Sequence, residues 1–351
     1  MISKADYLSV NLLSILAILP FYLSRKIFSF RFNINLETED WQKNIGLSYL
    51  LLLIGFYLGV KFGNDVTALG YLELAEVRMR GDELIENWGL KFQLFQGVAT
   101  YIYIKLIIAR LRSRDKQLTF MVVCYMIMFL FVGTIAVHKQ DLIFPIFLPI
   151  VISIAFSISN GKVFMISKVI LSMSVMLIVY SLSTGRSSFY FLLTEAGGRL
   201  LTGQVGPLFL WYDYFRTNEI LWGSSLPNPG GILPYESVDI AAYLMNKYFS
   251  SNGSIPVAFW GYSFADFGYS GIILVPLILL LYLLITLKIA GKILYSLELL
   301  AFYVYVGLKL LFLAFGSYAL LLYDFTLPFI LFTVTIFNTS KHVWYTRNNI
   351  H

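Results

Sequence analysis

The sequence is poor in the residues that build metal centres and disulfide frameworks. It contains one cysteine, Cys124, and three histidines in 351 residues. A single cysteine within an apolar run excludes an intramolecular disulfide framework and a thiolate metal cluster. The histidines, His138, His342 and His351, lack the paired spacing of metal ligands. We therefore predict no metal and no cofactor, and we expect no redox chemistry.

Charge is also scarce. Only 13% of the residues are Asp, Glu, Lys or Arg, and 58% are hydrophobic, whereas a soluble domain has roughly 25% charged residues. This composition is typical of a chain that lies mostly in lipid. No Gly-rich nucleotide-binding loop is present, so ATP is not indicated as an energy source. The net charge of +6 is explained by membrane orientation, and we expect no nucleic-acid binding.

Long apolar segments run through most of the sequence. About 20 apolar residues form a helix that crosses the hydrocarbon core, where every backbone N–H and C=O must be paired. By this criterion the chain is an all-α polytopic membrane protein, a single integral membrane domain over residues 1–351 with about nine (8–11) transmembrane helices. The predicted spans are residues 7–24, 45–60, 92–109, 118–137, 142–159, 163–182, 271–290, 294–315 and 318–337.

The positions of Lys and Arg predict the orientation. Loops on one side of the spans contain 14 of the 26 basic residues, and the other side has ten; Lys105 and Lys309 lie within spans. Cytoplasmic loops retain positive charge, so the first side faces the cytoplasm. The basic cluster at 110–114 is interpreted as a topological anchor, with anionic-lipid binding as the alternative. Residues 61–91 and 183–270 are then a shorter and a longer extracytoplasmic loop.

The longer loop contains three arginines, Arg186, Arg199 and Arg216. An isolated Arg at a membrane surface is often an anchor that reaches lipid phosphate. Three in one half of a loop favour an anionic ligand, because guanidinium stays charged and offers a planar fork to phosphate or pyrophosphate. Turn residues at 226–231 divide the loop, and apolar spacing predicts a short amphipathic surface helix over 238–249.

The same loop also combines acidic and aromatic side chains. Aromatic rings present apolar faces to the C–H side of a pyranose, and carboxylates accept hydrogen bonds from its hydroxyl groups. The mixture favours a carbohydrate ligand, although an interfacial aromatic belt also explains some of the rings. Candidate bases are Glu195, Asp213, Glu236 and the outward-turn residue His138, for which a merely solvated side chain is the alternative. The candidate sugar-binding aromatic residues are Tyr212, Tyr235, Trp260 and Tyr262.

The end of the long loop resembles the oligosaccharide repeat unit polymerases of O-antigen and capsule pathways, and the resemblance covers residues 183–290 best. In that family a Pro-rich stretch and a short sequence phrase precede a late span. The phrase consists of an aromatic residue and Gly, five further residues, Phe-Gly, two further residues and a last Gly. An earlier span ends in Gly-Arg. Here the matching residues are Pro256, Trp260-Gly261, Phe267-Gly268 and Gly271, with Gly185-Arg186 at the end of the sixth predicted span.

The resemblance implies a multi-pass glycosyltransferase of the bacterial cytoplasmic (inner) membrane. Such an enzyme transfers a growing glycan from undecaprenyl pyrophosphate to a hydroxyl of another lipid-linked repeat unit, at the outer membrane face. Arg186, with Arg199 or Arg216, would stabilise charge on the leaving pyrophosphate, and one of the candidate bases would take the proton. Arg78 and Arg80 of the shorter loop would hold the second substrate. The implied partners are undecaprenyl pyrophosphate-linked oligosaccharides, membrane lipid, a flippase and a chain-length regulator.

Other functions stay open from the sequence. A ligase of the same kind would move a finished glycan from the carrier to another acceptor. A transporter or flippase would have ionisable residues or Pro/Gly breaks deep within its spans and often an internal repeat. A membrane acyltransferase would need a catalytic histidine, and only His138 is placed for that role.

The polymerase interpretation predicts a defined glycan pattern. A strain without the protein should make surface glycan with single repeat units, and the wild-type gene should restore the ladder of longer chains. Arg186→Ala should not restore it, because the leaving pyrophosphate loses a cationic partner. Gel electrophoresis of the surface glycan measures this, with the empty vector as control. An unchanged ladder in the deletion strain would contradict the polymerase interpretation.

Overall fold

The structure is a computed structural model that describes most of the chain. The described residues are 4–23, 45–64, 71–113, 115–137, 139–159, 205–226, 234–250, 255, 257–294, 296–313, 316–322 and 325–336. They form helices, turns and irregular segments, with no strand among them. The all-helical prediction is therefore confirmed for this part of the chain.

The chain divides into two compact units, each assembled from three segments. Unit 1 contains Met1–Ile34, Ala196–Lys292 and Val306–Phe325, and unit 2 contains Asn35–Glu195, Ile293–Tyr305 and Thr326–His351. Helix α13, Ser296–Leu313, has residues in both. The helices of unit 1 are α1 (Lys4–Leu23), α10 (Val205–Phe215), α11 (Ile240–Phe249), α12 (Phe259–Ile293) and α14 (Ala319–Leu322). Those of unit 2 are α3 (Ile45–Phe62), α4 (Tyr71–Trp88), α5 (Leu90–Arg112), α6 (Lys116–Gly133) and α7 (Lys139–Ser159), with a further helical segment at 326–336.

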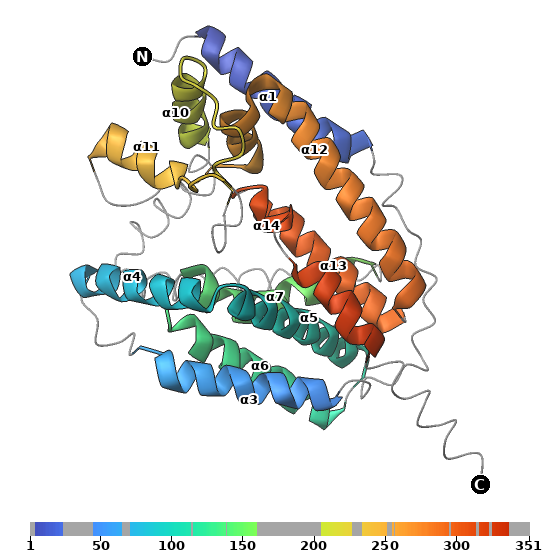
Figure 1. The fold of residues 1–351 in the computed structure, drawn as a ribbon. Helices are drawn as coiled ribbons and strands as arrows, with labels where there is room; N and C mark the ends of the chain where they lie inside the picture. Colours follow the sequence, from blue (N-terminus) through green and yellow to red (C-terminus); the bar gives the residue numbers. More distant parts are fainter. Residues whose placement is uncertain are drawn as a thin grey trace. The chain divides into compact units, whose positions relative to one another are not determined.

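Unit 2 is a bundle in which α6 packs against α3, α5 and α7 (Figure 1). The contact between α3 and α6 depends on Gly55 and Gly59, which are four residues apart on one face of α3. A Cβ atom at Gly59 would lie 2.6 Å from the Cβ of Phe131, and one at Gly55 would overlap Met128. Small residues at this spacing let two helix backbones approach closely, which is a common way to pack helices in membranes.

Two buried tyrosines link the helices of unit 2 through backbone carbonyls. Tyr103 of α5 and Tyr125 of α6 stack with ring centroids 6.0 Å apart. The Tyr125 hydroxyl donates to the carbonyl of Ser48 in α3 (2.9 Å), and the Tyr103 hydroxyl donates to the carbonyl of Pro145 in α7 (2.8 Å). Four residues after Pro145 stands another proline, Pro149, which has no N–H for that carbonyl. Tyr103 therefore satisfies an acceptor that α7 itself leaves open.

Unit 2 also buries an ion pair. Lys105 of α5 and Glu298 of α13 have side chains that are 4% and 3% exposed, and their charged atoms are 3.3 Å apart. The Tyr101 hydroxyl donates to the backbone carbonyl of Glu298 (3.3 Å). Removing one partner of such a buried pair costs about 3–5 kcal/mol, because the other charge is then uncompensated. The pair thus ties α5 to the first turn of α13.

In unit 1, α1 packs against α10 (Figure 1). Phe21 of α1 meets Phe259 at the start of α12 edge to face, with centroids 6.1 Å apart. Helix α11 begins at an N-cap, Asp239, whose side chain accepts from the backbone N–H of Ala242 (3.0 Å). The amphipathic helix that the sequence predicts over 238–249 is therefore confirmed, starting at Ile240.

Helix α12 is broken at Gly268. This residue has φ 61° and ψ −147°, outside the helical region, so α12 consists of Phe259–Phe267 and Tyr269–Ile293 joined by a kink. A positive φ is accessible to glycine at little cost. Gly271 follows the kink, and a Cβ there would overlap the carbonyl oxygen of Ser263. The geometry of this break thus requires Gly268 and Gly271, two glycines of the sequence phrase that resembles the polymerase family.

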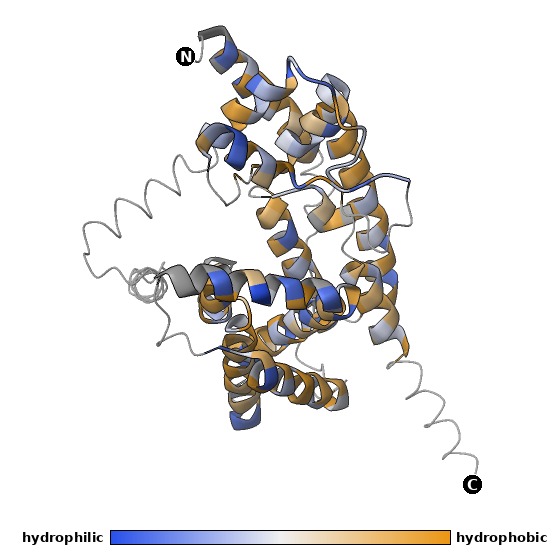
Figure 2. Cartoon of the chain, turned by 60° about the vertical axis from the view of Figure 1, so that its left-hand side comes forward, coloured by the Kyte–Doolittle hydropathy of each residue, from blue (hydrophilic) through white to orange (hydrophobic). Residues whose placement is uncertain are grey.

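The exposed surfaces of the helices are strongly apolar. Along α12 the side chains of Ile273, Leu277, Leu281 and Ile285 are about half exposed, and α1, α3 and α6 have similar exposed residues. Figure 2 shows mostly hydrophobic colouring along the described helices. Monomeric soluble proteins rarely expose apolar patches of this extent. These surfaces, with four helices long and apolar enough to cross a bilayer, indicate a membrane protein.

The structure supports some predicted spans and changes others. The four candidate spans among the described residues are α3, α5, α6 and α12, and shorter apolar helices cover Leu8–Leu23, Asp141–Phe156 and Thr326–Ile336. The predicted span at 163–182 lies outside the described residues. The span predicted over 318–337 contains α14 (Ala319–Leu322), the non-helical residue Phe325 and a second helix over 326–336, and residues 323 and 324 lie outside the described part. Pro328 fits the first turn of that second helix, where its missing N–H has no helical partner.

The predicted loops also contain more helix than their polarity indicates. In the shorter loop, 61–91, α4 packs against α5. In the longer loop, 183–270, α10 and α11 are helical, and α12 begins at Phe259, twelve residues before the predicted span. The first part of α12 is held by its buried aromatic face, Phe259, Trp260 and Phe264. Sequence polarity alone does not reveal that burial.

The geometry at the break predicts the effect of two glycine substitutions in α12. Gly271→Ala should lower the free energy of unfolding by about 1–3 kcal/mol, because the methyl group overlaps the Ser263 carbonyl. Gly291→Ala is the matched control, since nothing lies within 4 Å of a Cβ there, and alanine favours the helix. Thermal unfolding of the full chain in detergent would compare them. Equal melting temperatures for the two variants would contradict the described geometry.

Candidate functional site

An ion-pair cluster joins α10 to α1 in unit 1. Arg216 follows the last residue of α10, and its guanidinium donates to Asp213 (2.7 Å) and to Asp6 of α1. The same guanidinium lies 5.9 Å from the ring centre of Tyr212. We call Asp6, Asp213 and Arg216 the α10 charge cluster.

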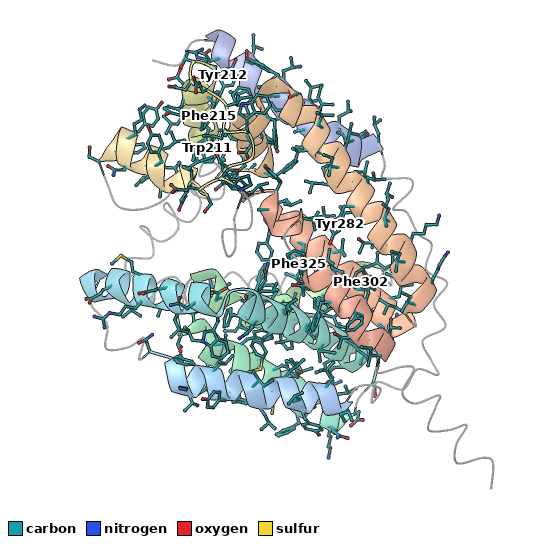
Figure 3. All side chains as sticks on the ribbon, viewed as in Figure 1. Trp211, Tyr212, Phe215, Tyr282, Phe302 and Phe325 are labelled. Atoms are coloured by element: carbon teal, nitrogen blue, oxygen red, sulfur yellow. The ribbon has the colours of Figure 1, made fainter. Side chains whose placement is uncertain are left out.

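Tyr212, which contacts Arg216, belongs to a set of aromatic side chains on α10 and α12. Tyr212 stacks on Phe264 of α12, with centroids 5.5 Å apart, and its hydroxyl lies 3.3 Å from that of Tyr269. Trp211 meets Tyr262 edge to face at 4.5 Å, and its indole N–H donates to the carbonyl of Ile255 (3.2 Å). Figure 3 labels Trp211 and Tyr212 on α10. Tyr269, just after the kink, is 58% exposed and is the outermost ring of this set.

A buried carboxylate holds the loop after α10. Asp266 is fully buried, and it accepts hydrogen bonds from the backbone N–H of Ser225 (3.1 Å), the Ser225 hydroxyl and the Tyr318 hydroxyl (2.6 Å). The backbone carbonyl of Asp266 accepts from Trp222 N–H (2.9 Å), and that of Ala265 accepts from Leu221 N–H (3.0 Å). We call residues 221–226 with Asp266 and Tyr318 the Asp266 latch.

The kink makes this latch possible. The last carbonyls of a helix have no intrahelical partner, and the helix ends at Phe267 because Gly268 departs from helical geometry. Leu221 and Trp222 supply the missing donors. The break in α12, the loop after α10 and the residue before α14 are thus fixed by one set of hydrogen bonds.

A second aromatic group lies on α10 and α11. The hydroxyls of Tyr214 and Tyr243 are 3.2 Å apart, and the ammonium of Lys247 lies 4.3 Å from the ring centre of Tyr214. The hydrogen bond with Tyr243 raises the pKa of Tyr214 to about 12, with smaller contributions from burial and neighbouring tyrosines. Burial, followed by the charge of Asp213, raises the pKa of Tyr248. With its pKa raised, the Tyr214 phenol is neutral at physiological pH and shares a hydrogen bond with Tyr243.

The structure brings together part of the predicted site. Arg216, Asp213 and Tyr212 lie on one turn of chain, and Tyr262 and the buried Trp260 lie in the first part of α12. Arg186, Glu195, Arg199 and His138 lie outside the described residues.

The remaining predicted residues do not join this group. Tyr235 donates to the carbonyl of Leu226 (3.3 Å), and Glu236 is exposed. In unit 2, Arg80 pairs with Glu76 one turn away in α4, where both side chains are mostly exposed. The backbone of Arg78 lies in the same helix, while its side chain is outside the described part. Trp260 is 4% exposed and is a core residue, so its predicted sugar contact is not supported by its position.

Sequence reasoning missed several residues of the site. Asp6 was not selected because it lies 210 residues from Arg216 at the start of an apolar helix. Asp266 lies within the sequence phrase, residues 260–271, that resembles the polymerase family. The signal that could have identified it is an acidic residue placed among aromatic residues. Ser225, Tyr269 and Tyr318 carry no sequence signal of their own, because only the fold brings their hydroxyls to these partners.

Comparison of the chain with protein-family models, curated proteins and solved structures found no match.

The Asp266 latch predicts a stability effect. Tyr318→Phe should lower the free energy of unfolding by about 1.5–3 kcal/mol, because the buried carboxylate loses a hydrogen bond. Tyr243→Phe is the control, since its exposed hydroxyl can bond to water, and it should change stability by about 0.5 kcal/mol or less. Unfolding of the two purified full-length variants in the same detergent tests this. A Tyr318→Phe variant as stable as wild type would contradict a structural role for this bond.

Proposed function

We propose that the chain polymerises lipid-linked oligosaccharide repeat units into O-antigen or capsular polysaccharide at the outer face of the bacterial cytoplasmic membrane. The observation that supports this most is the α10 charge cluster, in which a guanidinium fixes a carboxylate. Beside the cluster, the buried Tyr212 contacts Tyr269, an exposed ring that suits a sugar. The apolar helices fit a lipid-linked substrate, whose carrier stays in the bilayer.

The proposed reaction is a glycosyl transfer between two lipid-linked substrates. A hydroxyl oxygen of the acceptor sugar attacks the anomeric carbon of the donor glycan and forms the new C–O bond. The bond from that carbon to the pyrophosphate oxygen breaks, and undecaprenyl pyrophosphate leaves with the electron pair. The hydroxyl proton passes to a carboxylate. No external oxidant, reductant or nucleotide is needed, since the donor is already activated.

Asp213 is the best-placed carboxylate for the proton among the candidate bases in the described residues. Its side chain is 53% exposed, so a substrate can reach it, and Arg216 fixes its orientation. Glu236 is exposed but has no comparable ion pair among the described contacts. A base acts best when it is positioned within hydrogen-bond reach of the proton. Asp213 therefore takes the base role, with Arg216 as a positioning residue.

The pairing of Arg216 argues against this residue as the pyrophosphate ligand. Its guanidinium already donates to two carboxylates, Asp6 and Asp213, so those donor groups are not available to another anion. In the proposed enzyme, Arg186 and Arg199 take the pyrophosphate role, and Arg216 does not. This assignment revises the expectation that all three arginines act on the leaving group.

A transporter or flippase of lipid-linked saccharide is the second candidate. Two observations favour it: the Lys105–Glu298 pair buried within helices of unit 2, and the interruption of α12 at Gly268 in unit 1. Ionisable residues and broken helices inside membrane domains are typical of transporters. Product pattern separates the candidates. Loss of a polymerase leaves single-repeat glycan on the surface, loss of a flippase removes surface glycan, and loss of a ligase leaves long glycan on the carrier.

The polymerase proposal ranks Asp213 above Glu236 as the base that takes the proton. In a deletion strain, Asp213→Asn should give single-repeat glycan, because an amide accepts from Arg216 but takes no proton at neutral pH. Glu236→Gln should restore the ladder of longer chains. Gel electrophoresis of the surface glycan, with immunoblots showing equal amounts of each variant in the membrane, makes the comparison. A full ladder from Asp213→Asn would exclude Asp213 as the base, and an unaltered ladder in the deletion strain would exclude polymerisation itself.

A further inference from the structure

Trp222 is an exposed indole on a strained backbone. Its residue is 76% exposed, and its φ is 52°. A positive φ is uncommon for residues other than glycine and is an outlier for a bulky side chain. Such a conformation costs on the order of 1–3 kcal/mol and persists only where the surroundings enforce it. The fold thus exposes an aromatic side chain at an energetic cost.

The Asp266 latch is what enforces this conformation. Trp222 N–H donates to the carbonyl of Asp266 (2.9 Å), and the next residues bond on both sides: Ser224 N–H to Leu221 (3.1 Å) and Leu226 N–H to Gly223 (3.0 Å). Gly223 also has a positive φ, 89°. The backbone before and after the indole therefore has little freedom, and the direction in which the Trp222 side chain leaves the backbone is defined.

The segment that contains Trp222 packs against the kink in α12, which lies directly before Tyr269. A Cβ at Gly268 would lie 3.6 Å from the side chain of Ile220, so the segment before Trp222 packs on the break itself. On the other side of the break, Tyr269 is exposed and reaches Tyr212, beside the α10 charge cluster. The break thus sets the backbone positions of two exposed aromatic residues, Trp222 and Tyr269, and Tyr269 contacts Tyr212, the residue before Asp213.

We propose that the Trp222 indole is a stacking platform for a sugar ring of the lipid-linked glycan. This inference rests on the proposed polymerase function and adds a binding residue to it. A pyranose has an apolar C–H face that an indole covers well, and its hydroxyls remain free to reach neighbouring polar groups. A platform works only if the ring is already in position, because ordering it on binding would cost affinity.

The main alternative is that Trp222 anchors the chain in the membrane interface. Trp is common there because its ring is amphipathic. An anchor needs only the right depth, and relaxed residues at helix ends provide that. At Trp222 a left-handed backbone, bonded next to a buried carboxylate, also fixes the direction in which the side chain leaves the chain, which favours recognition of a ligand.

The test uses full-length variants in a deletion strain. Trp222→Gly removes the ring and relieves the positive φ, so its folding is not threatened. We expect it to lower the fraction of chains longer than one repeat about tenfold or more, while Trp222→Phe keeps most of the ladder. Phe249→Ala, which removes an exposed ring at the end of α11, is the control and should leave the ladder unchanged.

The outcomes separate the inference from the function on which it rests. A wild-type ladder from Trp222→Gly, in a strain where Asp213→Asn fails, would overturn the platform and leave the polymerase intact. A ladder in the deletion strain itself would overturn the polymerase.

A second measurement tests the anchor. Tryptophan fluorescence of wild type and Trp222→Phe is compared in nanodiscs with and without bromine on the lipid acyl chains. The difference in fluorescence between wild type and Trp222→Phe is the emission of Trp222. If Trp222 is a platform, bromine on the acyl chains should not quench this emission. Strong quenching of it would establish a membrane anchor instead.

Discussion

The carboxylate of Asp266 and the end of the helix that contains it fix most of unit 1. A buried carboxylate is costly unless donors surround it, and here Ser225 and Tyr318 provide them. The neighbouring carbonyls of Ala265 and Asp266 are satisfied by Leu221 and Trp222. The loop after α10, the break in α12 and the residue before α14 therefore depend on one another. The exposed positions of Trp222 and Tyr269 are consequences of that arrangement.

The two units satisfy their buried polar groups in different ways. In unit 2 the helices pack closely through Gly55 and Gly59, and tyrosine hydroxyls bond to carbonyls of neighbouring helices. Where Pro149 leaves the Pro145 carbonyl without an intrahelical donor, Tyr103 supplies one. In unit 1 a helix is broken, and the freed groups bind a loop. A loop held in this way can present side chains to a ligand, which a continuous apolar helix does not do.

The proposed function depends on charge and position together. Arg216, expected from the sequence to bind an anion, is paired with Asp6 and Asp213, so its proposed role changes from binding phosphate to orienting a carboxylate. The contact between Arg216 and Asp213 also gives Asp213 its rank among the candidate bases. Trp260 shows the reverse case, since an aromatic residue expected at the surface is part of the core.

The sequence by itself determined the helical class, the membrane character and the positions of most described helices. Hydrophobic length and charge placement are local properties, and the bilayer demands helices wherever they occur. The amphipathic spacing of α11 was also readable from the sequence. Only the tertiary structure decided that the last predicted span is interrupted, that α12 starts at Phe259, and that Asp6, Asp266 and Tyr318 belong to the site. Those features depend on hydrogen bonds and ion pairs between residues distant in the chain, which no local pattern records.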